Sequence, residues 1–268
     1  MDRVIERMGR SFQLTVEENE KVVVPDGLWS SILDQHQLVL VGWLLSTHPF
    51  NFEGLCRSVQ GMMNPVKGME ITQLPTNRLL LQFYHVIDRN RALDCCPWSF
   101  DKNVLILNEL KADENPVNVD LSRCDFYVHV HDLPLSRMNR GLATFIANWL
   151  GTFWDIEMDD QGRAWGATLR IRVSLDVNKP LTRALRIHTT MGEEQLITFT
   201  YEGLSIFCCL CGKLGHIQKY CEKMFEEGFC NPGEDTPYGP WLRAPRLQQV
   251  QRKEGEPRVS LTKAAPNS

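Results

Sequence analysis

The chain has 268 residues, of which 43% are hydrophobic and 23% are charged. These values are ordinary for a protein with a packed core, and they argue against wholesale disorder. At about 100–200 residues per domain, the length allows one large or two small domains plus a tail. With 29 basic and 33 acidic residues the formal net charge is −4, which argues against a polyanion-binding protein that works by bulk charge. Any contact with nucleic acid has to come from local basic patches.

Nothing in the sequence directs the chain to a membrane or to secretion. The N-terminal residues carry charges of both signs and lack the apolar stretch of a signal peptide. The longest apolar run, residues 38–45, is too short to cross a bilayer. The nine cysteines are an odd number with two adjacent pairs, which makes a poor disulfide framework. We therefore expect an intracellular protein of the nucleus or cytoplasm, not secreted, with no membrane partner and with clustered cysteines as metal ligands.

Residues 1–34 form a mixed N-terminal segment, and a first α/β unit follows over residues 35–112. Apolar runs and turn residues predict strands at residues 38–45, 68–74, 78–84 and 104–107. Helices are expected after Asn51, a suitable N-cap, and over residues 86–93. The apolar face of the first helix would consist of Phe52, Leu55, Val59 and Met62. This order is typical of a ferredoxin-like or RRM-like sheet, although the strands lack the aromatic-rich RRM signature.

Much of the same order begins again after a linker at residues 113–116, in a second unit over residues 121–202. Strands are expected at residues 125–130, 153–158 and 168–177, with a closing hairpin from residues 183–188 and 195–201. A helix over residues 139–150 would bury Leu142, Phe145, Ile146 and Trp149. The second unit therefore looks like a variant of the first.

Four ligand-type residues follow the second unit within residues 205–224. Cys208, Cys211, His216 and Cys221 are spaced C-x2-C-x4-H-x4-C. Zinc prefers four such sulfur and nitrogen ligands in a tetrahedron, so the spacing predicts one structural Zn²⁺. Gly212 and Gly215 fall where a tight turn and a close approach are needed. Because so short a segment has no core of its own, metal binding has to supply its folding free energy.

A zinc knuckle of this kind typically offers a small apolar platform for an unpaired base and lysines for phosphates. The phosphate candidates are Lys213, Lys219 and Lys223. The platform candidates are Cys209, Ile217 and Tyr220. The alternative is that the knuckle is only a structural clip or a protein-contact module.

The densest basic stretch lies in the second unit and includes Arg163, Arg170, Arg172, Lys179, Arg183 and Arg186. On a strand, Arg170 and Arg172 point to one face, where they could form a track for a phosphate backbone or simply a solvated face. His129 and His131 share a strand face with Tyr127, and we interpret them as polar-face residues rather than a metal or catalytic pair.

Residues 225–268 are rich in proline, glycine and charge, and we expect them to be mostly disordered. Within them, residues 238–244 form a docking motif, in which Tyr238 and Trp241 would anchor the tail to the folded body or be read by a partner. The predicted fold class is α+β: tandem ferredoxin-like or RRM-like sandwich units, then a CCHC zinc knuckle and a disordered tail. Phosphate-loop, nucleophile-elbow, polymerase and protease motifs are absent from the sequence, so we expect no enzyme.

The knuckle resembles the CCHC zinc knuckle of retroviral nucleocapsid and gag proteins. The longer context, in residues 126–134, 169–181, 201–204 and 238–244, resembles a plant family related to LINE-type retrotransposons. Its members carry an N-terminal domain of unknown function followed by a plant-type zinc knuckle. The resemblance implies zinc binding, nucleic-acid binding and an origin in a gag-like, first-reading-frame protein of a transposon. One residue departs from the pattern: gag-type knuckles usually carry an aromatic residue directly after the first cysteine, and here Cys209 stands there.

Together these patterns predict a zinc-dependent protein that binds single-stranded RNA or DNA. The alternative is a protein-interaction or self-association module in which the zinc knuckle is purely structural.

Overall fold

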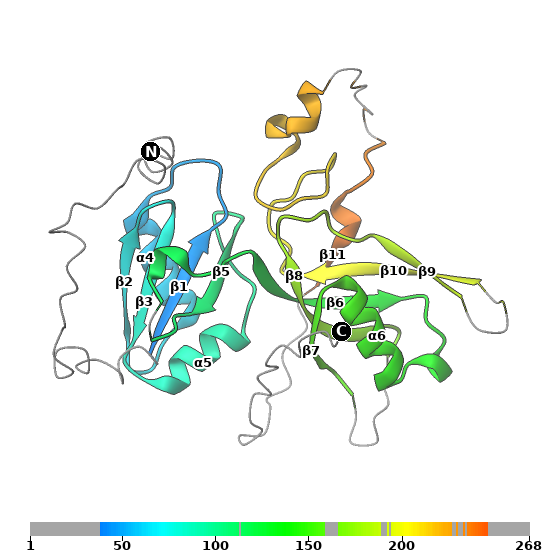
Figure 1. Cartoon of the computed structure of the whole chain (residues 1–268), viewed down its shortest axis with the longest axis horizontal. Helices are drawn as coiled ribbons and strands as arrows, with labels where there is room; N and C mark the ends of the chain where they lie inside the picture. Colours follow the sequence, from blue (N-terminus) through cyan, green and yellow to red (C-terminus); the bar gives the residue numbers. More distant parts are fainter. Residues whose placement is uncertain are drawn as a thin grey trace, which may run out of the picture.

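The computed structural model describes residues 38–112, 114–158, 166–188, 192, 194–226, 229, 233 and 235–245. The predictions for residues 1–34, for Arg163 and for the end of the tail lie outside the described residues. Figure 1 shows two sheets with their helices side by side, and a segment after the second sheet that runs on through the zinc-knuckle residues.

The first unit forms a five-stranded antiparallel sheet. Its elements are β1 (Val39–Leu44), α4 (Phe52–Met63), β2 (Met69–Leu74), β3 (Arg78–Phe83), α5 (Val86–Asp94), β4 (Trp98–Phe100) and β5 (Asn103–Glu109). The strands lie in the order β2-β3-β1-β5-β4. The predicted order of strands and helices is confirmed, and the structure adds the short strand β4, which the sequence pattern did not predict.

Helix α4 begins where the sequence indicated. The side chain of Asn51 accepts a hydrogen bond from the backbone N–H of Gly54 at 3.2 Å, which satisfies one of the free amides of the first turn. Its buried face consists of Leu55, Val59 and Met63. The placement of Met62 on that face is wrong, since this side chain is 40% exposed. Met63 takes the position because steps of four residues keep to one side of a helix.

The second unit repeats most of this strand order. Its elements are η1 (Pro116–Asn118), β6 (Arg123–His131), η2 (Leu135–Arg137), α6 (Arg140–Leu150), β7 (Thr152–Ile156), β8 (Leu169–Asp176), β9 (Ala184–His188), β10 (Glu194–Glu202) and β11 (Arg243–Ala244). The sheet order is β11-β10-β6-β8-β7, with β9 also paired to β10. The order β7-β8-β6-β10 matches β2-β3-β1-β5 of the first sheet. Strand β9 pairs antiparallel with β10 as β4 does with β5, and the described residues of the second unit have no helix at the position of α5.

Helix α6 packs on its sheet through small residues. Asn139 caps it by accepting a hydrogen bond from the N–H of Leu142 at 3.0 Å. The buried residues are Ala143, Ile146 and Ala147. The prediction that Phe145 and Trp149 are buried is wrong, because they are 61% and 50% exposed. Two alanines four residues apart let the helix lie close to the sheet, which turns the larger side chains outward.

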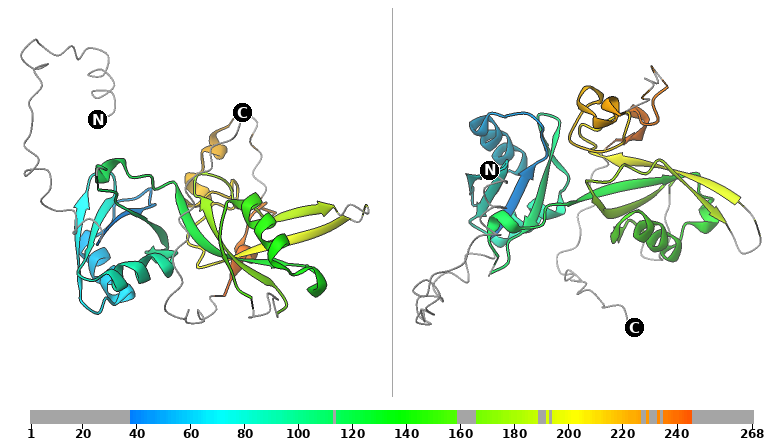
Figure 2. Two further views of the ribbon diagram at one scale, coloured as in Figure 1. Left: turned by 60° about the horizontal axis from the view of Figure 1, so that its bottom comes forward. Right: turned by 45° about the horizontal axis from the view of Figure 1, so that its top comes forward.

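One hydrophobic cluster spans both units, and a second lies within the first unit. Leu40, Leu44 and Leu105 of the first sheet pack with α4 on one face. On the opposite face, Val41 and Ile106 belong to the core of the second unit. The helix-free face of the first sheet is therefore covered by the second unit, and Figure 2 shows the two units in contact from two further directions. RRM domains stack RNA bases on the corresponding sheet face, and here that face is buried.

Polar contacts also join the units at the linker. The guanidinium of Arg78 in β3 donates to the carbonyl of Val119 at 2.8 Å and to that of Pro116 at 3.3 Å. These bonds fix the start of the second unit against the first sheet. No helix in the described part of the chain is both long and apolar enough to span a membrane.

Candidate zinc centre and nucleic-acid interface

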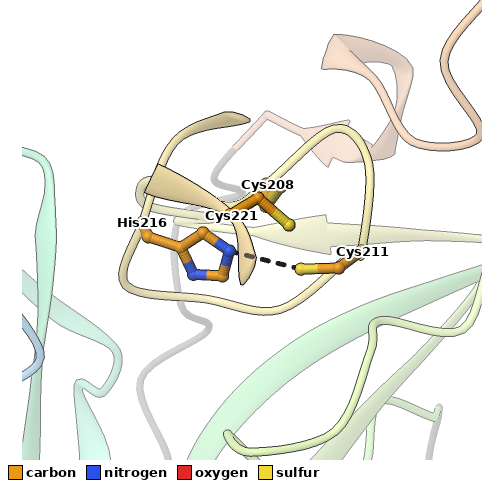
Figure 3. A group of neighbouring side chains, drawn as sticks. All are labelled: Cys208, Cys211, His216 and Cys221. Atoms are coloured by element: carbon orange, nitrogen blue, oxygen red, sulfur yellow. Dashed lines mark hydrogen bonds between the residues drawn. The ribbon is translucent and has the colours of Figure 1, made fainter. Parts of the chain in front are cut away.

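The four predicted metal ligands lie together. The ligand atoms of Cys208, Cys211, His216 and Cys221 are all within 4.8 Å of one another. His216 Nε2 is 3.3 Å from Cys211 Sγ (Figure 3). The three cysteines are buried, whereas His216 is half-buried. Within the part of the chain that the structure describes, this is the only such group of cysteine, histidine or acidic side chains.

A short turn brings the first two cysteines together. Phe207 and Leu214 form a bridge, and Cys208 N–H donates to the carbonyl of Lys213 at 2.9 Å. Inside this turn the amide of Gly212 donates to the carbonyl of Cys208 at 2.9 Å. The amide of Leu210 lies 3.4 Å from Cys208 Sγ, where it can donate to a thiolate.

The donor set fits zinc. Bonds of about 2.3 Å to sulfur and about 2.0 Å to nitrogen place tetrahedral ligands about 3.5–3.8 Å apart, within the observed spread. Burial raises the pKa of the Cys211 thiol to about 12, and burial also raises the pKa of Cys221. Thiolates at this position therefore need a cation, and a bound Zn²⁺ would supply the compensating charge. The cluster suggests a zinc-binding site.

The knuckle is docked on the first unit. Gly215 has φ +85°, and a Cβ added to it would lie 2.6 Å from Leu45 Cγ, so a larger residue would be strained and would clash. The amide of Ile206 donates to the carbonyl of Lys102 at 2.7 Å. The ring of Tyr220 meets the ring of His48 edge-on, with 4.7 Å between centroids.

The knuckle also contacts the second unit and the tail. Gly212 has φ +74°, and a Cβ there would lie 2.4 Å from the ring of Tyr238. The amide of Tyr238 donates to the carbonyl of Cys209 at 3.1 Å, and the amide of Leu181 donates to that of Gly212 at 2.9 Å. The knuckle thus contacts both units and the tail.

Residues 238–244 contact the folded body, but one of the expected anchors is wrong. Leu242 is 1% exposed, whereas Trp241 is 58% exposed. Strand β11 pairs with the end of β10 in parallel, where Arg243 lies opposite Tyr201. Leu242 therefore takes the anchoring position that the sequence suggested for Trp241, and the indole remains open to solvent.

The residues proposed to contact nucleic acid at the knuckle all lie at the surface. Those with exposed side chains are Lys213, Ile217, Lys219, Tyr220 and Lys223. Cys209 is only half-buried. Sequence reasoning missed Phe225, which is 82% exposed in a short 3-10 turn after the last cysteine. The only signal for it was an aromatic residue close to Lys223.

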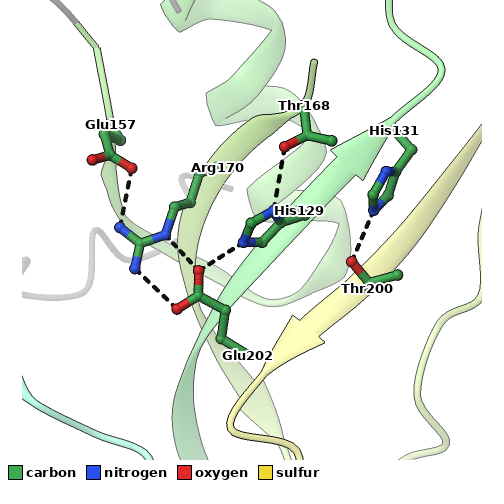
Figure 4. A network of polar contacts seen from close by, with 7 residues as sticks. All are labelled: His129, His131, Glu157, Thr168, Arg170, Thr200 and Glu202. Carbon is green, nitrogen blue, oxygen red and sulfur yellow. Dashed lines mark hydrogen bonds and ion pairs between the residues drawn. The ribbon is translucent and has the colours of Figure 1, made fainter. Parts of the chain in front are cut away.

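The interpretation of Arg170 and Arg172 as an exposed basic track is wrong. They are 7% and 5% exposed. Arg170 donates from Nε and Nη2 to the two carboxylate oxygens of Glu202, at 2.6 and 3.0 Å, and from Nη1 to Glu157 at 3.1 Å (Figure 4). Its guanidinium also lies 3.7 Å from the centroid of the Tyr127 ring.

Arg172 helps to join the two units. It donates to Asp125 at 3.1 Å and to the carbonyl of Leu93 in α5 at 2.9 Å. The sequence showed the strand face on which both arginines lie, but not the carboxylates and the helix end that cover it. These side chains are therefore used within the protein.

The two histidines belong to the same polar layer. His129 Nε2 is 2.6 Å from Glu202 Oε1 and its Nδ1 is 3.2 Å from Thr168 Oγ1, while His131 Nε2 is 2.8 Å from Thr200 Oγ1. Burial would raise the pKa of Glu202, but hydrogen bonds from His129 and Arg170 outweigh it and lower this pKa. Burial, with a contribution from His129, lowers the pKa of His131. The interpretation of the histidines as polar-face residues fits this geometry.

Two protein families match parts of the chain. Residues 32–118 match the family described as "Domain of unknown function (DUF4283)", and residues 175–223 match the family described as "Zinc knuckle". The chain therefore carries this domain followed by a CCHC zinc knuckle, which is a gag-like arrangement.

One curated relative is similar to part of the chain. An uncharacterized protein of Arabidopsis thaliana is 28% identical over 101 residues, which are 38% of this chain and 32% of that protein. The chain thus matches about a third of the length of this curated relative.

Among solved structures, the Caenorhabditis elegans NONO-1 homodimer is 10% identical with a TM-score of 0.24, over 52% of this chain and 50% of that one. RNA recognition domains 1 and 2 of Drosophila melanogaster Sex-lethal are 14% identical with a TM-score of 0.22, over 51% and 85% of the two chains. The first two RRM domains of yeast poly(U) binding protein are 12% identical with a TM-score of 0.22, over 50% and 81%. These neighbours define no binding surface on this chain.

Proposed function

We propose that this protein binds single-stranded nucleic acid, RNA or DNA, and that the binding depends on zinc. The observation that carries the proposal is the surface of the knuckle: the segment that holds the Cys/His cluster also carries three exposed lysines, Lys213, Lys219 and Lys223. Lysines on a small rigid loop supply the local positive charge that the acidic chain lacks as a whole.

The same surface offers apolar groups for bases. Ile217 and Tyr220 are each 45% exposed, and Phe225 lies just beyond the last cysteine. Bases of any sequence stack on such side chains, which suits a single strand with its bases free. Tyr220 and Phe225 would do the stacking that gag-type knuckles assign to an aromatic residue at the position of Cys209.

The burial of the other candidate surfaces concentrates the proposed contact on the knuckle. The helix-free face of the first sheet packs against the second unit, and Arg170 and Arg172 are held in internal ion pairs. An RRM-type contact on the first sheet would need the two units to separate. The knuckle needs no such rearrangement.

The test is fluorescence anisotropy of short labelled single-stranded RNA and DNA, at two salt concentrations, with and without a zinc chelator. We expect binding that weakens with salt and with chelator, and that is lost in His216→Ala. Cys56→Ser is the matched control, because Cys56 lies on α4, outside both the four clustered ligands and the proposed platform, and should keep both zinc and binding. Equal binding by His216→Ala and the parent would refute a zinc-dependent grip.

We further propose that the role is binding rather than catalysis, since four protein ligands leave no open position on the metal.

The domain of unknown function followed by a knuckle, together with the Arabidopsis relative, supports an origin in the gag-like protein of a plant LINE-type retrotransposon. The shared strand order of the two sheets supports a tandem of RRM-like units. We also propose an intracellular location, because the reducing interior of a cell keeps metal-binding thiolates from oxidising.

A second candidate function is a protein-interaction or self-association module. The observation in its favour is that the knuckle is packed on both units, through Gly215 on Leu45 and Gly212 on Tyr238, as a structural clip would be. The exposed Phe145 and Trp149 on α6 would then be contact residues. A stoichiometric oligomer in light scattering, combined with no affinity for any oligonucleotide, would favour this function.

A further inference from the structure

A groove of about 980 Å³ lies next to the knuckle, between the end of β6, the β9–β10 hairpin and the tail. A volume of this size accommodates a nucleotide. Its charged, aromatic and hydrogen-bonding lining includes His131, Asp132, Arg183, Thr200, Tyr238 and Trp241, and the Asp132 carboxylate accepts a hydrogen bond from Thr198 Oγ1 at 2.8 Å. No residue of this set belongs to the zinc centre.

Trp241 provides an open aromatic surface in this groove. A Cβ added to Gly239 would lie 1.9 Å from Cζ3 and 2.3 Å from Cη2 of the indole, so the ring rests directly on the backbone of Gly239. The side chain is nevertheless 58% exposed. An indole that is held against the backbone and open to solvent loses little freedom when a flat ring stacks on it.

Arg183 provides a fixed positive charge in the same groove. Its Nη1 donates to the carbonyl of Pro237 at 2.8 Å, and its guanidinium lies 5.2 Å from the centroid of the Tyr238 ring. The side chain is exposed, and a guanidinium has five N–H donors, so donors remain for a ligand. His131 and Thr200 add hydrogen-bonding groups to the lining.

The groove is continuous with the knuckle. Tyr238 lines the groove, and its ring covers Gly212, the residue directly before Lys213. Leu181, which also lines the groove, donates its amide to the carbonyl of Gly212. Two lining residues, Tyr238 and Leu181, therefore contact the residue next to Lys213, which places the groove beside the proposed phosphate contact of the knuckle.

We propose that the groove is a second binding site for the same strand, which takes one unstacked base on Trp241 and a neighbouring phosphate on Arg183. This inference rests on the proposed nucleic-acid binding by the knuckle. A flat aromatic surface beside a guanidinium and hydroxyl groups matches the flat base, anionic phosphate and polar edges of a nucleotide. An apolar peptide side chain would match the indole but not the charge.

The test compares two lengths of labelled single strand, about four and about twelve nucleotides, on the full-length zinc-loaded protein. Trp241→Ala should raise the Kd of the longer strand about ten-fold, which is within the effect of losing one stacked base. Trp241→Phe should keep most of the affinity, and the Kd of the shorter strand should be unchanged. Trp149→Ala is the matched control, because this tryptophan is 50% exposed but lies on α6 and outside the groove.

A second measurement covers the case in which Trp241→Ala disturbs the docked tail. The unaltered protein is photocrosslinked to a strand that carries 4-thiouridine along its length, and peptides with Tyr238 or Trp241 should be labelled together with the knuckle. Zinc-dependent binding with no effect of Trp241→Ala, or crosslinks confined to the knuckle, would overturn the inference and leave the proposed function standing. The groove would then be open to another ligand, such as a peptide. Failure of the parent protein to bind any strand would overturn both.

Discussion

Arg170 and Glu202 form a two-point ion pair in the interior of the second unit, with Nε 2.6 Å from Oε1 and Nη2 3.0 Å from Oε2. The two side chains are 7% and 3% exposed. Glu202 is the last residue of β10, and the knuckle starts a few residues later. The pair therefore fixes the point from which the zinc-binding segment leaves the sheet.

Loss of the carboxylate should destabilise the protein strongly. In Glu202→Gln the guanidinium of Arg170 stays buried without its main counter-ion, so we expect the free energy of unfolding to fall by about 3 kcal/mol. Urea unfolding at neutral pH measures it. Glu194→Gln is the control, because its ion pair with Arg186 is exposed and should change stability by less than about 0.5 kcal/mol. Equal effects of both substitutions would contradict the assignment.

Stability should also depend on pH through the same carboxylate. The pKa of Glu202 is lowered below its ordinary value of 4.5, because the hydrogen bonds from His129 and Arg170 outweigh the opposing effect of burial. A lowered pKa stabilises the folded state above about pH 4.5, and this contribution is lost as the pH falls through the folded-state pKa.

The measurement is the unfolding free energy of the parent and of Glu202→Gln from pH 7 to pH 3. Since acid would release a bound zinc ion from both proteins alike, the difference between them isolates this carboxylate. We expect the difference to shrink below about pH 4.5. A constant difference over the whole range would rule the mechanism out.

The close packing of the knuckle on the first unit makes Gly215 sensitive to substitution. An added methyl group would lie 2.6 Å from Leu45 Cγ, on a residue with φ +85°. We expect Gly215→Ala to lower stability by about 1–3 kcal/mol. Gly61→Ala is the control, because a Cβ there meets nothing within 4 Å and alanine favours the helix. Thermal unfolding should separate the two, with Gly61→Ala at or above the parent.

Zinc content should follow the four ligands one by one. The parent should carry about one zinc per chain, and Cys211→Ser should carry almost none, since each structural site needs all four ligands. Cys209→Ser should retain the metal. Far-UV circular dichroism should remain close to that of the parent in both, because the two sheets have their own core. Full zinc retention in Cys211→Ser would mean that another ligand set is used.

The salt dependence of the affinity for a single strand should show whether the lysines of the knuckle contact phosphates. Each phosphate contact on a single strand contributes about 0.7 to the slope of log Kobs against log salt. Replacement of Lys213, Lys219 and Lys223 by alanine should therefore reduce the slope by about 2. Lys67→Ala, an exposed lysine of the first unit, should leave it unchanged. An unchanged slope in the triple variant would place the phosphate contacts elsewhere.

The sequence by itself determined the features that depend on residues close together in the chain. The spacing from Cys208 to Cys221 defined the ligand set, and Asn51 and Asn139 marked the starts of two helices. The residues that make each of these contacts lie close together in the sequence, so their geometry follows from spacing and local hydrogen bonding. Strand β4 (Trp98–Phe100) was not predicted, because three residues are too few to show the alternation of apolar and polar side chains typical of a strand.

Only the tertiary structure decided which faces are covered. The periodicity of β8 placed Arg170 and Arg172 on one face, but their partners Glu202 and Asp125 come from other strands. In the same way, the sequence did not show that Leu242, and not Trp241, is the buried anchor of the tail. The indole of Trp241 lies in an open groove. A strand or helix pattern defines a face of an element. What lies against that face depends on parts of the chain that are distant in sequence, and their approach is set by packing of the whole core.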